Sequence, residues 1–195
     1  MKLQNICVYC GSNGGSRPDY ADGARELARE LVRRDIGLVY GGASVGIMGI
    51  VADAVLAEGG RVIGVIPEPL MRKELAHRGL TELHVVQTMH ERKTMMAARA
   101  DGFVALPGGA GTLEEIFETW TWAQLGMHEK PCGLLNIAGY YDQLAGFPDH
   151  AVQESFMRAE HRAMLAVESR PGALLDRFAS YQPPTVSKWI DPGEH

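Results

Sequence analysis

Cysteine is scarce in this 195-residue chain, where it occurs only at Cys7, Cys10 and Cys132. Cys7 and Cys10 have the CxxC spacing of redox and zinc sites, but no second pair accompanies them and they lie in an apolar β-rich run. Side chains three positions apart on a strand point to opposite faces of the sheet. The sequence therefore predicts buried thiols without redox chemistry. No cluster of His, Cys and Asp has the spacing of metal ligands, so we expect no metal.

Basic clusters and long apolar runs are also missing. The formal net charge is −5, and no run of Lys and Arg exceeds two residues, which argues against a nucleic-acid partner. No apolar run reaches the roughly 18 residues of a membrane helix. The N-terminus enters a strand at once, without the apolar segment and cleavage site of a signal peptide. We therefore expect a cytoplasmic protein that contacts neither membrane nor nucleic acid.

The apolar residues form short β-rich runs that alternate with longer helical patterns, in a composition typical of a globular enzyme. Strands are predicted at residues 5–9, 37–40, 61–66, 84–87, 102–106 and 133–137. Several runs are almost continuously apolar, as in parallel strands buried on both faces. The alternation predicts an α/β fold, a doubly wound and mostly parallel sheet flanked by helices.

The predicted helices share apolar residues spaced three and four apart. They lie at about residues 18–32, 47–55, 89–100, 113–125, 141–156, 163–168 and 172–178. Pro18 is well placed to open the first of them, and Phe156 falls on the apolar side of the fifth. With no repeat or linker in the chain, we expect one catalytic, nucleotide-binding domain at 1–180 and a proline-containing arm at 181–195.

Two glycine-rich turns follow the first two strands. The first, at 10–16, lacks the GxGxxG spacing of dinucleotide-binding proteins, and no GxxxxGK[ST] motif occurs in the chain. Its Ser12 either donates to a phosphate or sugar or simply belongs to a chain reversal. In the second turn, at 41–49, glycines such as Gly42 serve either close ligand approach or close packing. Both interpretations stay open for each turn.

The third turn, LPGGAGTLEE at 106–115, follows a buried strand at the end where α/β sheets bind ligands. Gly108, Gly109 and Gly111 remove side chains that would block a ligand. Thr112 offers a hydroxyl, and the helix predicted to begin there offers free N–H groups and a positive dipole end. This turn therefore predicts a phosphate site.

Glutamate and arginine beside this turn each have two interpretations. Thr112 and Glu115 have capping-box spacing, as do Thr88 and Glu91, so Glu115 is either a cap or a chemical group. Arg92, like the lysine after it, belongs either to a solvated helix face or to an anion site, where its planar fork would suit phosphate.

Six segments of the chain resemble the Lonely Guy family of cytokinin riboside 5′-monophosphate phosphoribohydrolases, long labelled "lysine decarboxylase". They are CGS at 10–12, YGGASVGIMG at 40–49, MHERK at 89–93, PGGAGTLEE at 107–115, TWAQLG at 121–126 and CGLLNIAGYYD at 132–142. The resemblance implies a Rossmann-like homodimer that hydrolyses the N-glycosidic bond of a nucleoside 5′-monophosphate such as AMP or isopentenyl-AMP.

The resemblance also assigns residues. It implies that Arg92 and Glu115 are catalytic. The substrate contacts it implies fall on Glu74, Lys93, Gly109, Ala110, Gly111, Thr112, Leu113, Glu114 and Thr121, and Ser12, Gly42 and Gly108 join them from the turns above. The chain departs from the family at Ala110, where many relatives carry tyrosine, and in the segment around Glu74.

The chemistry of the two catalytic candidates fits such a reaction, which needs no cofactor. An oxocarbenium-like transition state requires a carboxylate near the anomeric carbon and a base to activate water, and Glu115 can supply both. Arg92 stays protonated, so its expected role is electrostatic. Two alternatives remain: a non-catalytic nucleotide carrier, and a pyridoxal-phosphate decarboxylase, which would require a Schiff-base lysine.

Overall fold

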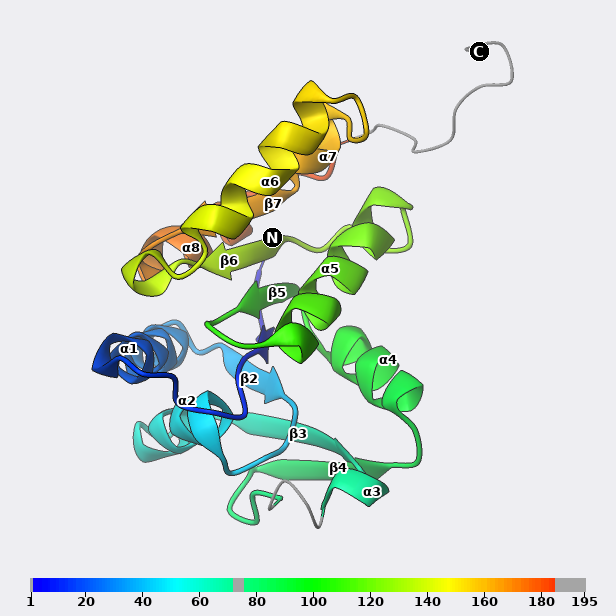
Figure 1. Cartoon of the computed structure of the whole chain (residues 1–195). Helices are drawn as coiled ribbons and strands as arrows, with labels where there is room; N and C mark the ends of the chain where they lie inside the picture. The colour runs from blue at the N-terminus through cyan, green and yellow to red at the C-terminus, as the bar shows by residue number, and fades with distance from the viewer. Residues whose placement is uncertain (1, 72–75, 185–195) are drawn as a thin grey trace.

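Seven parallel strands form one sheet with helices on both faces (Figure 1). The computed structural model describes residues 2–71 and 76–184. The strands are β1 (Asn5–Tyr9), β2 (Gly37–Tyr40), β3 (Val62–Pro67), β4 (Glu82–Val86), β5 (Gly102–Ala105), β6 (Cys132–Leu135) and β7 (Leu165–Glu168). The helices are α1 (Pro18–Arg33), α2 (Gly46–Ala57), α3 (Glu68–Met71), α4 (Met89–Arg99), α5 (Ala110–Gln124), α6 (Asp142–Gln153), α7 (Ala159–Ala163) and α8 (Pro171–Ala179), with a 3-10 turn η1 (Ile137–Gly139). None of the described helices is long and apolar enough to cross a bilayer.

The strand order is β4-β3-β2-β1-β5-β6-β7. The chain builds the sheet outward from β1 to β4 and then returns to the other side of β1 with β5. Loops that leave the carboxyl ends of β1 and β5 therefore turn to opposite faces of the sheet and open a crevice between them, which is where doubly wound proteins bind ligands. The predicted Rossmann-like, doubly wound parallel sheet is confirmed.

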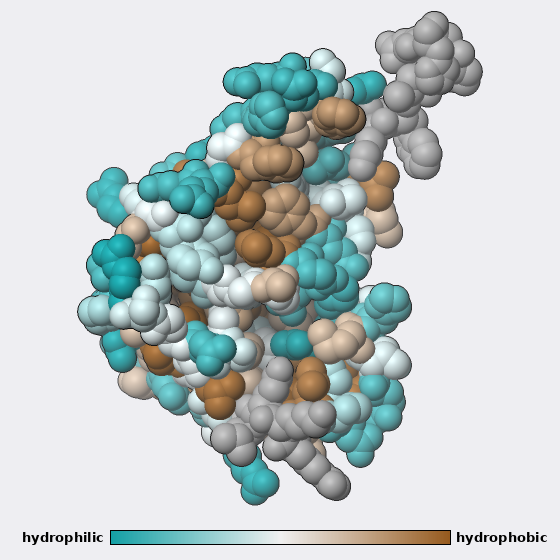
Figure 2. Space-filling model, viewed as in Figure 1, coloured by the Kyte–Doolittle hydropathy of each residue, from teal (hydrophilic) through white to brown (hydrophobic). Residues whose placement is uncertain are grey.

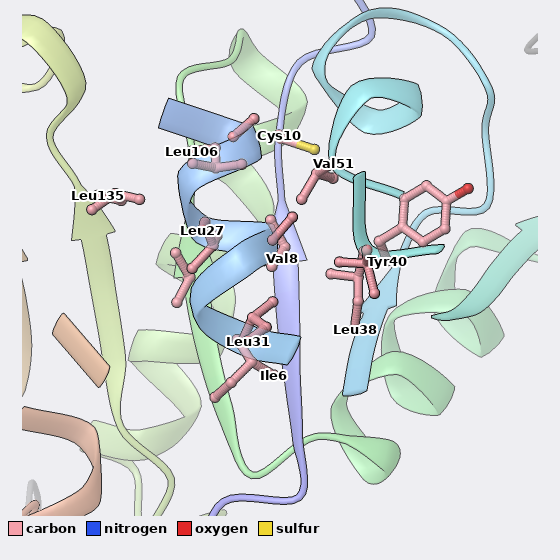
Figure 3. Packing of buried hydrophobic residues seen from close by; sticks show 14 of the residues in the cluster. Ile6, Val8, Cys10, Leu27, Leu31, Leu38, Tyr40, Val51, Leu106 and Leu135 are labelled. Atoms are coloured by element: carbon pink, nitrogen blue, oxygen red, sulfur yellow. The ribbon is translucent and has the colours of Figure 1, made fainter. Parts of the chain in front are cut away.

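Helix α1 shows how the sequence specifies one layer. Pro18 opens the helix at its first position, as predicted, and the helix buries a stripe of small and branched side chains. Leu27 and Leu31 pack against Ile6 and Val8 of β1 (Figure 3), and all four are at most 1% exposed. Burying one such side chain contributes about 1.5–3 kcal/mol to folding.

The sheet separates two apolar cores. One core lies under α1, α2 and α8, and the other under α4 and α5. Cys7 belongs to the second core and Cys10 to the first, so the CxxC thiols point to opposite faces as predicted. Cys132 is also buried, and all three thiols are free.

The sequence prediction was wrong near the C-terminal edge of the sheet. Residues 163–168 were predicted as helix, but α7 ends at Ala163 and Leu165–Glu168 pair in parallel with β6. A short apolar run fits the periodicity of a helix as well as that of a strand. Here the strand forms because it can pair with the edge of β6. Phe156 lies beyond the end of α6 and is 90% exposed rather than packed. Most of the predicted arm at 181–195 lies outside the described residues.

The buried thiols should be unreactive in the folded protein. Burial raises the pKa of Cys7 and Cys10 far above the working range and that of Cys132 to about 12, so the thiolate is almost absent at pH 8. We expect no labelling by a disulfide reagent within minutes at pH 8 and complete labelling of all three thiols in denaturant. Rapid labelling of the folded protein would contradict this packing.

Candidate active site

A cavity of about 530 Å³ lies at the carboxyl ends of β1 and β5. Its walls come from the turn after β1, the end of β2, the starts of α2 and α4, and the turn between β5 and α5. The predicted residues that line it are Ser12, Arg92, Gly108, Gly109, Ala110, Gly111, Thr112, Glu114 and Glu115. The topology thus brings together segments that are far apart in sequence.

The turn between β5 and α5, residues 106–112, forms one wall and is called the anion loop below. Helix α5 begins at Ala110, and its N-cap is Gly109 without a side-chain cap. The first N–H groups of a helix have no intrahelical acceptor and lie at its positive end. A Cβ atom added at Gly109 or Gly111 would meet nothing within 4 Å. The loop therefore offers an open, positively polarised surface to an anion.

The early start of α5 corrects the predicted capping box. Thr112 lies inside the helix rather than at its N-cap, so Glu115 does not serve as a cap. Glu115 instead lies in the second turn, is 9% exposed, and lines the cavity. The other predicted box is confirmed in its first bond, since Thr88 accepts from the N–H of Glu91 at 3.1 Å, whereas the Glu91 carboxylate accepts from the N–H of Gln87, one residue before the N-cap, at 2.8 Å.

Arg92 faces Glu115 across the floor of the cavity. Its guanidinium is buried, with Nη1 4.0 Å from Glu115 Oε1 and Nη2 donating to the carbonyl of Gly41 at 3.4 Å. The 4.0 Å separation is longer than a hydrogen bond, so the two groups do not use any of their hydrogen-bonding positions on each other. Within the described residues, Arg92 Nε has no hydrogen-bond acceptor. Of the two interpretations of Arg92, the solvated helix face is therefore wrong.

Gly41 is the feature that makes room for this arginine. A Cβ atom at Gly41 would overlap the guanidinium group of Arg92. Gly42, by contrast, does not line the cavity; it has φ +78° and packs against Ile66 and Val65. In the second glycine turn, close packing therefore explains Gly42, whereas Gly41 serves the site.

Lys93 lies beside Arg92 but outside the cavity lining. Its ammonium group donates to Glu114 at 2.6 Å and lies 2.8 Å from Glu118, which ties α4 to α5. Burial alone would lower the pKa of Lys93, but hydrogen bonds and charge interactions with the two carboxylates outweigh it and raise that pKa. Lys93 therefore holds the two helices that carry the arginine and the glutamate.

The remaining predicted contacts lie elsewhere. Leu113 packs its side chain against the core under α5. Thr121 donates to the carbonyl of Phe117 at 2.7 Å and lies nine residues beyond Thr112, about 13 Å along the helix axis. Glu74 lies outside the described residues.

Sequence reasoning missed several residues of the cavity wall. They are Gly11, Asn13, Tyr20, Gly41, Met48, Leu70, Met89, Met96 and Tyr140. Met89 and Met96 flank Arg92 at helical spacing, a signal that could have placed them on its face of α4. Tyr140 follows the sixth strand, whose carboxyl end was expected at the same edge of the sheet. Within 2–71 and 76–184, no cluster of three metal-ligating side chains occurs.

Removal of the Lys93 ammonium should destabilise the fold. Lys93→Met leaves Glu118 half-buried without its cation, so we expect the free energy of unfolding to fall by about 1–3 kcal/mol. Because the folded pKa is raised, the stabilisation is present below the ordinary value of 10.5 and lost as pH rises above it. Denaturant titrations of wild type, Lys93→Met and the exposed control Lys2→Met at pH 8 and 11 measure this. Equal unfolding energies at pH 8 would contradict the role of Lys93.

Comparison with known proteins identifies relatives of this chain. The family model described as "Possible lysine decarboxylase" matches residues 48–178. A probable cytokinin riboside 5′-monophosphate phosphoribohydrolase of Oryza sativa subsp. japonica is 49% identical over 182 residues, covering 93% of this chain and 73% of the relative. A cytokinin riboside 5′-monophosphate phosphoribohydrolase of Arabidopsis thaliana is 48% identical, covering 93% and 85%.

Among solved structures, the molybdenum cofactor carrier protein of Chlamydomonas reinhardtii aligns with a TM-score of 0.69 at 20% identity, covering 91% of this chain and 99% of that chain. The molybdenum cofactor binding protein of Rippkaea orientalis aligns at 0.68 and 19%, covering 92% and 98%. At such low identity these structures support the fold alone. The plant relatives match nearly the whole chain at almost half identity, and on that ground the chain belongs to the Lonely Guy family.

Proposed function

We propose that this protein hydrolyses the N-glycosidic bond of cytokinin riboside 5′-monophosphates to free base and ribose 5-phosphate. The observation that carries the proposal is the cavity itself, which places the anion loop next to the buried pair Arg92 and Glu115. The plant relatives, named as phosphoribohydrolases of this substrate class, support the same reaction.

The 5′-phosphate belongs on the anion loop. Gly109, Ala110 and Gly111 are exposed to the cavity and carry no bulky side chain. Thr112 adds a hydroxyl at the same helix end, and Ser12 faces the cavity from the turn after β1. Helix N-termini of this kind bind phosphate through backbone N–H groups and the helix dipole. The phosphate then holds the ribose over the floor of the cavity.

Glu115 acts at the anomeric carbon in this proposal. Its carboxylate stabilises the positive charge that develops on the ribose and accepts a proton from the attacking water. The water oxygen forms the new bond to C1′ as the bond from C1′ to the base nitrogen breaks, and the electron pair leaves with the base. A second proton, from solvent or from the site, neutralises the base.

Arg92 acts as an electrostatic and orienting group. Its Nε has no acceptor within the described residues, and an unpaired buried donor is costly, so a ligand oxygen would satisfy it. A guanidinium stays protonated, and it can therefore stabilise a ribose oxygen or the electron-rich departing base. The 4.0 Å gap to Glu115 lets both groups act on one ligand.

The base faces an apolar wall in this proposal. Met48, Leu70 and Met89 line the same cavity as Arg92, and methionine adapts readily to branched apolar groups. This lining supports isopentenyl-AMP as a substrate alongside AMP.

Pyridoxal-phosphate decarboxylation is not supported by the site. Of the five lysines, none in the described part of the chain lines the cavity. Lys2 is exposed, Lys93 is paired with Glu114 and Glu118, and Lys130 donates to the carbonyl of Ala97. A Schiff base requires a free amine in the pocket.

A homodimer remains a proposal that rests on the family resemblance, and the cytoplasmic location expected from the sequence remains a proposal as well. Apolar side chains exposed beyond α5, along α6 and just after α6 support the dimer. Met127 is 68% exposed, Phe147 63% and Phe156 90%, and Figure 2 shows apolar side chains gathered beside α6. Large exposed apolar groups of this kind mark interaction surfaces.

Sedimentation velocity tests the dimer. We expect twice the mass of the 21.3 kDa chain at micromolar concentration and a shift toward monomer in Phe147→Glu, because a charge would be buried unpaired in the interface. A wild-type monomer at that concentration would contradict the proposal.

Glu115→Gln tests the chemistry. The amide keeps the shape of the side chain but can neither accept the water proton nor offset the ribose charge, so kcat for adenine release from AMP should fall on the order of 10²–10⁴-fold. Glu91→Gln, an exposed capping residue near the site, is the matched control and should keep wild-type kcat. Base release is followed by chromatography, and unfolding temperature checks folding.

Three outcomes separate the proposals. Loss of turnover in folded Glu115→Gln alone supports hydrolysis at this site. Equal activity in all three proteins contradicts the role of Glu115. Binding of AMP and isopentenyl-AMP by wild type without release of base would replace the enzyme with a nucleotide carrier.

A further inference from the structure

The segment after β6 carries two consecutive tyrosines to the anion loop. Its path is fixed by Asn136, whose side chain accepts from the N–H of Tyr141 at 2.7 Å and donates to Asp142 at 2.6 Å. Ala138 and Gly139 have positive φ values of 51° and 74°, which turn the chain back through η1. Tyr140 and Tyr141 leave this turn toward the carboxyl end of β5.

Three successive carbonyl groups of the anion loop, at residues 106 to 108, are held by donors from outside it. In chain order the donors are the Tyr141 hydroxyl at 2.6 Å, the Gly11 N–H at 3.1 Å and the Tyr140 hydroxyl at 2.6 Å. Burial raises the pKa of Tyr141, so its hydroxyl keeps its proton and remains a donor. All three carbonyl oxygens are thereby directed at protein donors.

A glycine-rich anion loop depends on such restraint. Gly108 and Gly109 allow peptide groups to rotate at low cost because neither residue has a Cβ atom. A rotated peptide would direct a carbonyl oxygen, rather than an N–H, at the phosphate, and the two negative ends would repel. The glycines that give a ligand access to the loop therefore also leave the N–H groups of the loop free to change direction.

We propose that Tyr140 and Tyr141 are positioning residues that fix the peptide orientation of the anion loop and so set the affinity for the phosphate group. The inference deepens the proposed function and rests on it, since it takes the loop as the site of the 5′-phosphate. Tyr140 is the outer member, 42% exposed and on the cavity wall. Tyr141 is the inner member, 1% exposed.

Tyr140→Phe isolates the hydroxyl. The ring of Tyr140 packs edge-on against Tyr20 and Tyr141, with centroids 5.5 Å and 4.9 Å apart, and phenylalanine keeps these contacts. Tyr181→Phe is the matched control, because Tyr181 lies near Glu129 and Cys132, at the opposite end of β6. Tyr141→Phe is a second variant whose unfolding temperature is measured alongside.

The dissociation constant of ribose 5-phosphate and the KM for AMP should rise about five- to tenfold in Tyr140→Phe, the loss expected for one hydrogen bond. Its kcat should change less than about twofold, and binding of adenosine, which lacks the phosphate, should not change. Tyr141→Phe should show the same pattern. Tyr181→Phe should match wild type in every measurement.

Unchanged affinity for ribose 5-phosphate in Tyr140→Phe, or an equal loss for adenosine, would overturn the inference. Wild type that binds ribose 5-phosphate but releases no base would overturn the proposed reaction, while the comparison of dissociation constants would still decide the role of the tyrosines. Absence of ribose 5-phosphate binding by wild type would overturn both.

Discussion

The buried arginine and glutamate at the centre of the sheet edge impose the constraint on which this site depends. Two buried charged groups are costly unless each is paired or hydrogen-bonded. The chain meets this cost with Gly41, whose missing Cβ admits the guanidinium, and with Lys93, which binds Glu114 and Glu118 and thereby holds α4 against α5. Because Arg92 Nη1 and Glu115 Oε1 stay 4.0 Å apart, the two groups attract without a direct hydrogen bond, and both can act on one ligand above them.

The topology places this pair beside an anion site. The strand order reverses between β1 and β5, so their loops diverge at one edge of the sheet and form the two sides of the cavity. Three elements meet at the anion loop. The turn after β1 and the segment after β6 hold its carbonyl groups, and α5 presents its N–H groups to the cavity. Phosphate affinity and bond cleavage are thus assigned to different elements that meet at one point.

Much of this arrangement could be predicted from the sequence, for physical reasons. Continuous apolar runs and helical spacing specified the parallel sheet, and the glycine turn after β5 indicated the anion loop. The predictions failed where distant contacts decide. The edge strand at 165–168 needed β6 as a partner, and α5 begins three residues earlier than predicted because Gly109, not Thr112, is its N-cap. The roles of Gly41 and Tyr140 could not be predicted from the sequence, because Gly41 makes room for Arg92 and Tyr140 donates to Gly108, both far away along the chain.

A crystal structure with ribose 5-phosphate bound would test whether the anion loop and Glu115 act on one ligand. We expect the phosphate on the N–H groups at residues 109–112 and the C1′ atom within about 3.5 Å of the Glu115 carboxylate, with Arg92 Nε donating to a ligand oxygen. A phosphate bound away from the anion loop, or a C1′ atom turned away from Glu115, would contradict it.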